Sequence, residues 1–181
     1  TETGDHFGEV LAAGDLDGDF IDELAIGAPA EDVSFHPDAG AVTVLRGASP
    51  LGLITDSATN FDQSGVVDGE ALGDFDNFAY SLRIGDFVEG TSAGNDLAVG
   101  IPQESVGSPA PFAFVGAVTF IPGGGATLEP GAATLWSKGY FDSAGTQIDS
   151  PEYYGYALAA GDFDGTGHDD LAIGAVQVEG I

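Results

Sequence analysis

Four acidic side chains at regular spacing stand out in the run Asp15-Leu16-Asp17-Gly18-Asp19-Phe20-Ile21-Asp22-Glu23. The first, third, fifth and ninth positions carry the carboxylates of Asp15, Asp17, Asp19 and Glu23, and the seventh offers the backbone carbonyl of Ile21. Ca²⁺ takes six to eight hard oxygen ligands, and alternate residues of a tight loop can all turn inward to supply them. The spacing therefore predicts a calcium site, with Asp22 facing away or holding backbone amides.

The alternative for this loop is a plain hairpin turn with solvated acids, because Asp and Gly dominate turns. Four carboxylates so close in sequence, however, repel one another unless a cation lies among them. This repulsion favours the metal site over the plain turn.

A loop near the end of the chain has the same spacing. Its candidate ligands are Asp162, Asp164, Thr166, the backbone carbonyl of His168 and Asp170. Thr166 replaces a carboxylate with a neutral oxygen, so we expect this loop to bind calcium less tightly than the first.

The corresponding loop in the middle of the chain has changed. Asp86 and Asp96 stand two residues further apart than the matching pairs, and Val88 at the third position has no side-chain oxygen. Either this loop has lost its metal, or Asp86, Glu89 and Asp96 form a reshaped site. The sequence leaves both possibilities open.

These loops lie inside a unit that occurs three times. The aspartate after a glycine recurs at 15, 86 and 162, so the units repeat every ~70 to 76 residues. A second match follows the first two units in the same order, as Gly40-Ala41-Val42-Thr43-Val44-Leu45 and Gly116-Ala117-Val118-Thr119-Phe120-Ile121. Two matched motifs in the same order indicate a true internal repeat.

Each unit is expected to be all-β. Residues 11–13 and 24–27 are apolar runs too short for helices, and residues 41–45 are β-branched and alternating. Residues 53–61 and 135–141 are expected to form a fourth, outer strand. Four antiparallel strands per unit predict β-propeller blades, about two and a half of them, at residues 1–73, 74–149 and, in part, 150–181.

The motifs resemble the FG-GAP repeat of integrin α-subunit propellers and of bacterial and archaeal integrin-like extracellular proteins. The resemblance rests on Phe7-Gly8, Gly14-Asp15-Leu16-Asp17-Gly18, Gly27-Ala28-Pro29 and the strand Gly40-Ala41-Val42-Thr43-Val44. The middle unit departs with Phe78-Ala79, and Glu23 stands where the family pattern has aspartate. The resemblance implies an extracellular or cell-surface module for adhesion or ligand binding, through loops on one face of the ring.

A propeller ring closes with about four to eight blades, more than this chain supplies. We therefore expect the remaining blades to come from the same protein, of which this chain would be a piece, or from neighbouring copies.

The net negative charge of the chain limits the classes of partner that it can bind. There are 30 acidic residues against 3 basic ones, for a net charge of −27. Such a polyanion repels phosphate backbones and anionic membranes, so nucleic acid and membrane insertion are not expected. A protein or carbohydrate ligand is expected instead. The chain has no cysteine, and its three histidines lie far apart, which argues against thiolate chemistry and a histidine-based zinc site.

Catalysis is not expected. Residues 90–94 match the Gly-x-Ser-x-Gly pattern, but residues 97–100 after them align with strands, whereas that motif needs a helix there. Two other functions remain as alternatives, a structural or assembly subunit of a surface layer or fibre in a saline habitat and an accessory domain of a larger secreted hydrolase. Trp136 and the aromatic run at Tyr153, Tyr154 and Tyr156 suit either a ligand platform or packing, with packing favoured.

Overall fold

The structure is a computed structural model that describes residues 3–66, 72–87, 94–106, 114–124, 128–137 and 152–176. Those residues form two four-stranded antiparallel sheets and one two-stranded hairpin. The first sheet contains β1 (Val10–Gly14), β2 (Glu23–Ala28), β3 (Ala41–Ala48) and β4 (Gly52–Asp62). The second contains β5 (Ser81–Gly85), β6 (Asp96–Ile101), β7 (Ala117–Ile121) and β8 (Thr134–Ser137). The hairpin contains β9 (Ala157–Gly161) and β10 (Asp170–Gly174).

In both full sheets the spatial order of the strands equals their order in the sequence. This up-and-down arrangement, repeated with the same register, is the β-propeller blade predicted from the sequence. The hairpin repeats the first two strands, so about two and a half blades are present. The prediction for residues 53–61 is confirmed by β4. In the second sheet β8 confirms the start of 135–141, and residues 138–141 lie outside the described part.

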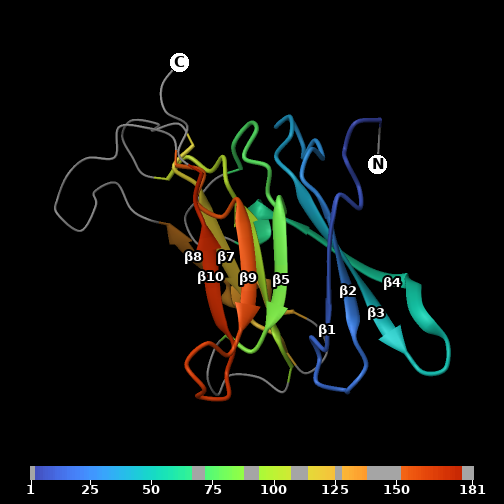
Figure 1. Ribbon diagram of the computed structural model, residues 1–181. Coiled ribbons are helices and arrows are strands. Elements are labelled where there is room, and N and C mark those ends of the chain that lie inside the picture. Colours follow the sequence, from blue (N-terminus) through green and yellow to red (C-terminus); the bar gives the residue numbers. More distant parts are fainter. Residues whose placement is uncertain are drawn as a thin grey trace.

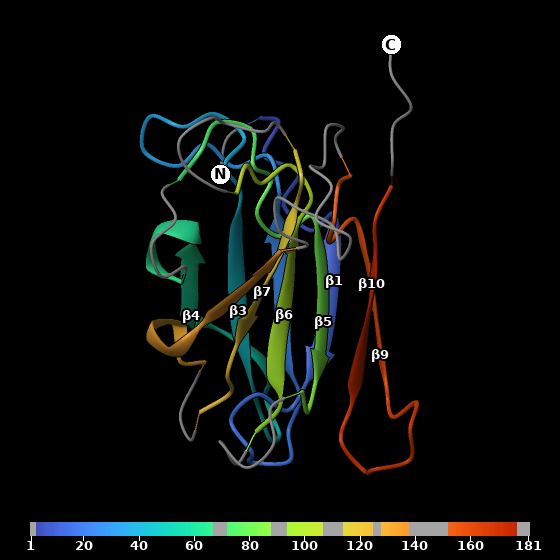
Figure 2. The same cartoon turned by 90° about the vertical axis from the view of Figure 1, so that its left-hand side faces the viewer.

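The inner strands of successive sheets lie side by side. β1 contacts β5, and β5 contacts β9 (Figure 1). Figure 2 shows the outer strand β4 on the side away from the β9–β10 hairpin, with β1 and β5 between them. The short 3-10 helices η1 (Gln63–Gly65) and η2 (Pro130–Ala132) follow β4 and precede β8. No helix in the described ranges has the length and apolar character that crossing a bilayer requires.

Apolar side chains fill the space between neighbouring sheets. Val42 of the first sheet, Leu82 and Val99 of the second, and Phe78, which precedes β5, belong to one cluster and have no exposed surface. A smaller cluster joins the second sheet to the hairpin, and Tyr154 packs against it as predicted. Trp136 lies on the outer strand β8, 55% exposed, with its ring against Phe120.

Glycines allow the backbones of neighbouring sheets to approach closely at two equivalent places. Gly40 adopts a φ of +88°, and a Cβ there would lie under 3.0 Å from backbone atoms of Phe78. Gly116, with a φ of +79°, has the same relation to Tyr154. Only a residue without a side chain combines this φ with this contact at low cost. The conserved geometry within the chain confirms that the repeat units pack on one another in one manner.

Candidate metal centre

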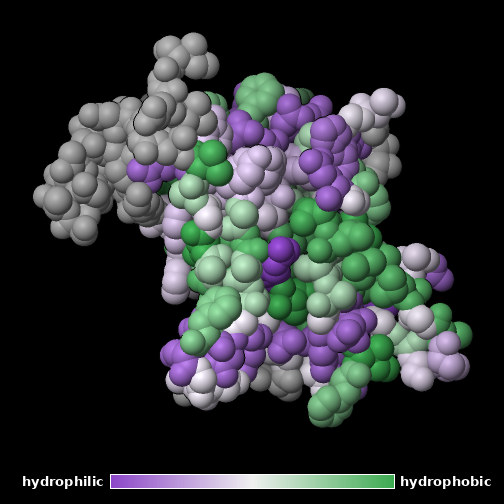
Figure 3. Space-filling model, in the orientation of Figure 1, coloured by the Kyte–Doolittle hydropathy of each residue, from purple (hydrophilic) through white to green (hydrophobic). Residues whose placement is uncertain are grey.

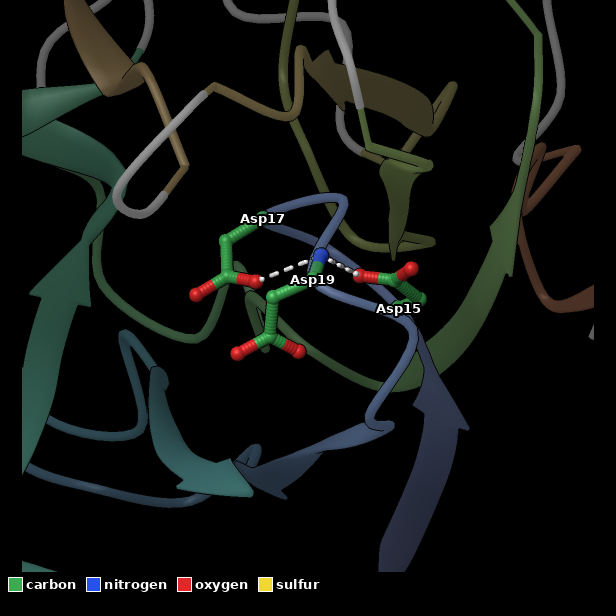
Figure 4. Close-up of side chains that lie close together, drawn as sticks. All are labelled: Asp15, Asp17 and Asp19. Carbon is green, nitrogen blue, oxygen red and sulfur yellow. Dashed lines mark hydrogen bonds between the residues drawn. The ribbon is translucent and has the colours of Figure 1, made fainter. Parts of the chain in front are cut away.

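The first acidic loop joins β1 to β2, and its own carboxylates fold it. Asp15 Oδ1 accepts hydrogen bonds from the amides of Gly18 (2.6 Å) and Asp19 (3.1 Å), and Oδ2 accepts from Phe20 (2.8 Å). The amide of Asp19 also donates to Asp17 Oδ1 at 3.2 Å (Figure 4). Gly18 and Phe20 have positive φ, which turns the chain tightly enough for these bonds. The aspartates therefore hold the loop in its conformation through hydrogen bonds to its own amides.

Three of the predicted ligands come together in this loop. Oxygen atoms of Asp15, Asp17 and Asp19 lie within 4.8 Å of one another. Figure 4 shows their carboxylates around one region at the end of β1. Asp17 is buried, Asp15 half-buried and Asp19 exposed. A set of hard carboxylate oxygens at this separation fits a divalent cation such as Ca²⁺. Ile21 follows in the same loop, and its amide donates to Asp19 Oδ1 at 2.9 Å.

Glu23 lies outside this group. Its side chain is buried, and its two oxygens accept hydrogen bonds from the amides of Leu16 (2.8 Å) and Gly47 (3.2 Å). Burial raises the pKa of the Glu23 carboxyl, an effect that these two amides oppose. The charges of Asp17 and Asp19 raise this pKa further. Glu23 thus ties the loop to the end of β3.

An acidic residue at the same position accepts two such amides in the second unit and a loop amide in the third, which the sequence reasoning missed. Asp96 is buried and accepts from the amides of Phe87 (2.9 Å) and Gly123 (3.1 Å). Asp170 Oδ2 accepts from the amide of Phe163 at 2.9 Å. Each of these acids is the first residue of the second strand of its unit and pairs with the glycine that ends the first. That recurrent position was the available signal.

The loop between β9 and β10 reproduces the first loop with a different third member. Oxygens of Asp162, Asp164 and Asp170 lie within 4.8 Å of one another, and all three residues are at the surface. Asp162 accepts hydrogen bonds from three amides of the loop, as Asp15 does. At the fifth position Thr166 donates its amide to Asp164 Oδ1 at 3.0 Å. This loop lies at the same end of the molecule as the first, at the bottom of Figure 1.

The middle loop is arranged differently. Asp86 Oδ2 contacts Nδ1 of His168 from the next unit at 2.8 Å, and both oxygens of Asp96 accept from amides. In the described residues Asp86 and Asp96 belong to no group of three possible metal ligands. Glu89, the third member of the predicted reshaped site, lies outside those residues, as does Val88. The ring of His168 therefore contacts the neighbouring loop in addition to the backbone role expected for this residue.

Backbone hydrogen bonds join the successive loops. The amide of Asn95 donates to the carbonyl of Asp15 at 2.7 Å, and the amide of Asp169 donates to the carbonyl of Asp86 at 2.9 Å. These are equivalent positions of consecutive units. These bonds link the loops at one end of the molecule, where hydrophilic residues gather in the lower part of Figure 3 with hydrophobic residues among them.

Comparison with known proteins agrees with this geometry. Residues 7–45 match the family model of the FG-GAP repeat. The chain is 32% identical over 187 residues to integrin alpha-PS2 of Drosophila melanogaster, an alignment that covers 99% of this chain and 12% of that protein. It is 28% identical over 191 residues to integrin alpha-PS5 of the same organism, covering 99% of this chain and 16% of that protein. The chain thus spans a small part of the length of these relatives.

Proposed function

Because the chain is an FG-GAP, integrin-like β-propeller sequence, we propose that it is a calcium-binding extracellular module that binds a protein or carbohydrate ligand without catalysis. One observation carries the calcium assignment: a group of three close carboxylates occurs in the first loop and again, two units later, in the third. Repetition of the donor set at one end of the fold supports a common ligand for both loops.

We assign the first calcium ion to Asp15, Asp17, Asp19 and the carbonyl of Ile21, and a second to Asp162, Asp164, Thr166, Asp170 and the carbonyl of His168. Glu23 would join the first set only by releasing one of its two amides. The middle loop is proposed to be free of metal, because Asp86 and Asp96 belong to no group of three possible ligands among the described residues, and Val88 at the third position has no side-chain oxygen. Bound calcium would stabilise the folded chain by mass action, since the unfolded chain does not present the loops.

Calorimetric titration of the chelator-stripped chain tests this assignment. We expect two ions to bind and the melting temperature to rise with calcium. Asp17→Asn should remove one ion and Asp164→Asn the other, whereas Asp56→Asn, on β4 outside both loops, should leave two. Absence of binding, together with a melting temperature indifferent to calcium, would mean that the aspartates only shape turns.

The exposed side of the first sheet supports a further part of the proposal. Phe7 and Leu11 are 51% and 54% exposed, while the equivalent Phe78 and Leu82 of the second unit have no exposed surface because the first sheet covers them. We propose that the sheets are blades with boundaries at 1–73, 74–149 and 150–181, and that the exposed side receives another blade of the same kind. That blade would come from the same protein or from a neighbouring copy.

Sedimentation of the chain distinguishes these sources. A discrete oligomer or polymer that Leu11→Lys disrupts would favour neighbouring copies, as in a surface layer or fibre. A monomer at all concentrations would favour blades of the same protein.

A measurable hydrolytic rate from the chain alone would contradict the non-catalytic assignment.

A further inference from the structure

Arg46 places a positive charge directly on the first acidic loop. Its Nη2 lies 3.0 Å from Asp17 Oδ2 and 3.4 Å from Asp19 Oδ2. The Asp17 side chain is 3% exposed, the Asp19 side chain 35% and the Arg46 side chain 51%. The guanidinium thus reaches in from solvent to two of the three carboxylates that come together in this loop.

The fold fixes this approach. Arg46 lies near the end of β3, where the pairing with β4 shifts register between Val44 and Arg46. The next residue, Gly47, donates its amide to Glu23 and leaves no room for a Cβ beside the carbonyl of Asp22. The end of β3 is therefore held against the last residues of the loop, which keeps the guanidinium within reach of the aspartates.

The arginine occupies the outer oxygens of the pair. Asp17 and Asp19 each use Oδ1 for a loop amide and Oδ2 for Arg46. A calcium ion attracted to these carboxylates meets a cation already present, and like charges at such separations repel. The Arg46 side chain is already 51% exposed, so a displaced guanidinium can turn into solvent.

The third loop lacks this feature within the described residues. Arg46 and Arg83 are the arginines of the chain, and Arg83 on β5 donates to the carbonyl of Leu82. None of the ion pairs found in the described ranges joins an arginine to Asp162, Asp164 or Asp170. The chain therefore contains one acidic loop with a bound guanidinium and one that serves as its internal reference.

We propose that Arg46 is a built-in counter-cation of the first loop, which holds Asp17 and Asp19 together without calcium, is displaced when calcium binds, and so sets the calcium affinity of this loop. The proposal rests on the calcium-binding function proposed above. A pair that exists only in the calcium-free state stabilises that state and weakens calcium binding by the same factor. Removal of the arginine must therefore raise the calcium affinity of the first loop and lower the stability of the calcium-free chain.

The test uses the full chain with Asp164→Asn, so that only the first loop titrates. Arg46→Gln should tighten calcium binding about three- to tenfold and lower the melting temperature in chelator, with the difference disappearing at saturating calcium. Arg46→Lys keeps the positive charge but lacks the planar guanidinium. Its calcium affinity and its melting temperature in chelator should lie between those of the chain with Arg46 and those of Arg46→Gln. Arg83→Gln removes the same charge elsewhere and should change neither quantity.

Four results would overturn the proposal. Weaker or unchanged binding in Arg46→Gln would mean that the arginine positions the aspartates instead of competing with calcium. Equal effects of Arg46→Gln and Arg83→Gln would reduce the result to overall charge. A further result concerns chains with an intact Asp164. If calcium bound only to the third loop in these chains, with either arginine or glutamine at position 46, the chain would still bind calcium but Arg46 would have no role in it. Absence of binding by every variant would refute both proposals.

Discussion

Alanine substitution of four glycines would separate the two costs that shape the contact between neighbouring sheets. Gly116 has a positive φ and faces backbone atoms of Tyr154, and Gly52 has a positive φ of +81° with nothing within 4 Å of a Cβ. Gly100 has an ordinary φ but faces the carbonyl oxygen of Gly155, and Gly131 has neither constraint. Gly52 therefore tests backbone conformation alone, Gly100 close approach alone and Gly116 both. Gly131 tests neither.

The expected losses follow from these environments. A left-handed conformation costs an alanine about 1 to 2 kcal/mol, and this should be the whole effect at Gly52. An extra methyl forced against a backbone that cannot rotate away costs about 1 to 3 kcal/mol, the effect expected at Gly100. The two costs together give about 2 to 5 kcal/mol at Gly116, while a surface site such as Gly131 should change by no more than about 0.5 kcal/mol.

Urea unfolding at fixed calcium would measure these differences, and thermal melts would check them. A loss of 1 kcal/mol lowers the melting temperature of a chain this long by about 2 to 4 °C, so Gly116→Ala should melt about 4 to 20 °C lower. If Gly116→Ala were no less stable than Gly52→Ala, the close approach of the second sheet to the hairpin would not exist in solution. An equal loss at Gly131 would show that the loss depends neither on a positive φ nor on a close backbone approach.

Three further changes test other contacts. Asp96→Asn would place an amide NH₂ against the backbone amide of Phe87 or of Gly123. It should lower the free energy of unfolding by about 1 to 3 kcal/mol in a denaturant titration, with or without calcium. Thr119→Val should raise the melting temperature by a few degrees, about 1 kcal/mol, because Thr119 Oγ1 is buried without a hydrogen-bond partner among the described residues. A hydrogen bond to Tyr156, and to a lesser extent burial, raises the pKa of Tyr80 to about 12. The stability that this shift contributes is therefore fully present below pH 10 and is lost as the pH rises through about 12. Tyr156→Phe should bring this pKa back toward 10 in a spectrophotometric titration, and an unchanged value would mean that burial alone causes the shift.

The strands were predictable because the repeat supplied independent copies of each pattern. Alternation at residues 41–45 and the short apolar runs around Leu11 and Leu24 specified three strands, and all three formed within a few residues of the expected limits. The pairing order followed from strand count and short connections. The sequence placed Ala79 at the position of Gly8 and Gly155, but it did not show that an alanine keeps the positive φ of those glycines, as the structure has it.

The acidic loops were predictable in part. Spacing correctly placed Asp15, Asp17 and Asp19 together, because alternate residues of a tight turn share one side. Spacing could not separate a ligand from an anchor at the ninth position, where Glu23 accepts from the amide of Gly47 on β3, a strand distant in sequence. The contact of His168 with Asp86 was hidden for the same reason, since it joins residues of different units.

The backbone bonds between successive loops have an evolutionary consequence. Asn95 and Asp169 donate to the preceding unit, and Asp15 and Asp86 accept from the following one, so a unit carries a donor on one side and an acceptor on the other. A duplicated gene segment that encodes one unit would bring both halves of the contact with it. New units could then enter such a protein without any new interface having to evolve, and side chains elsewhere on each copy would be free to diverge.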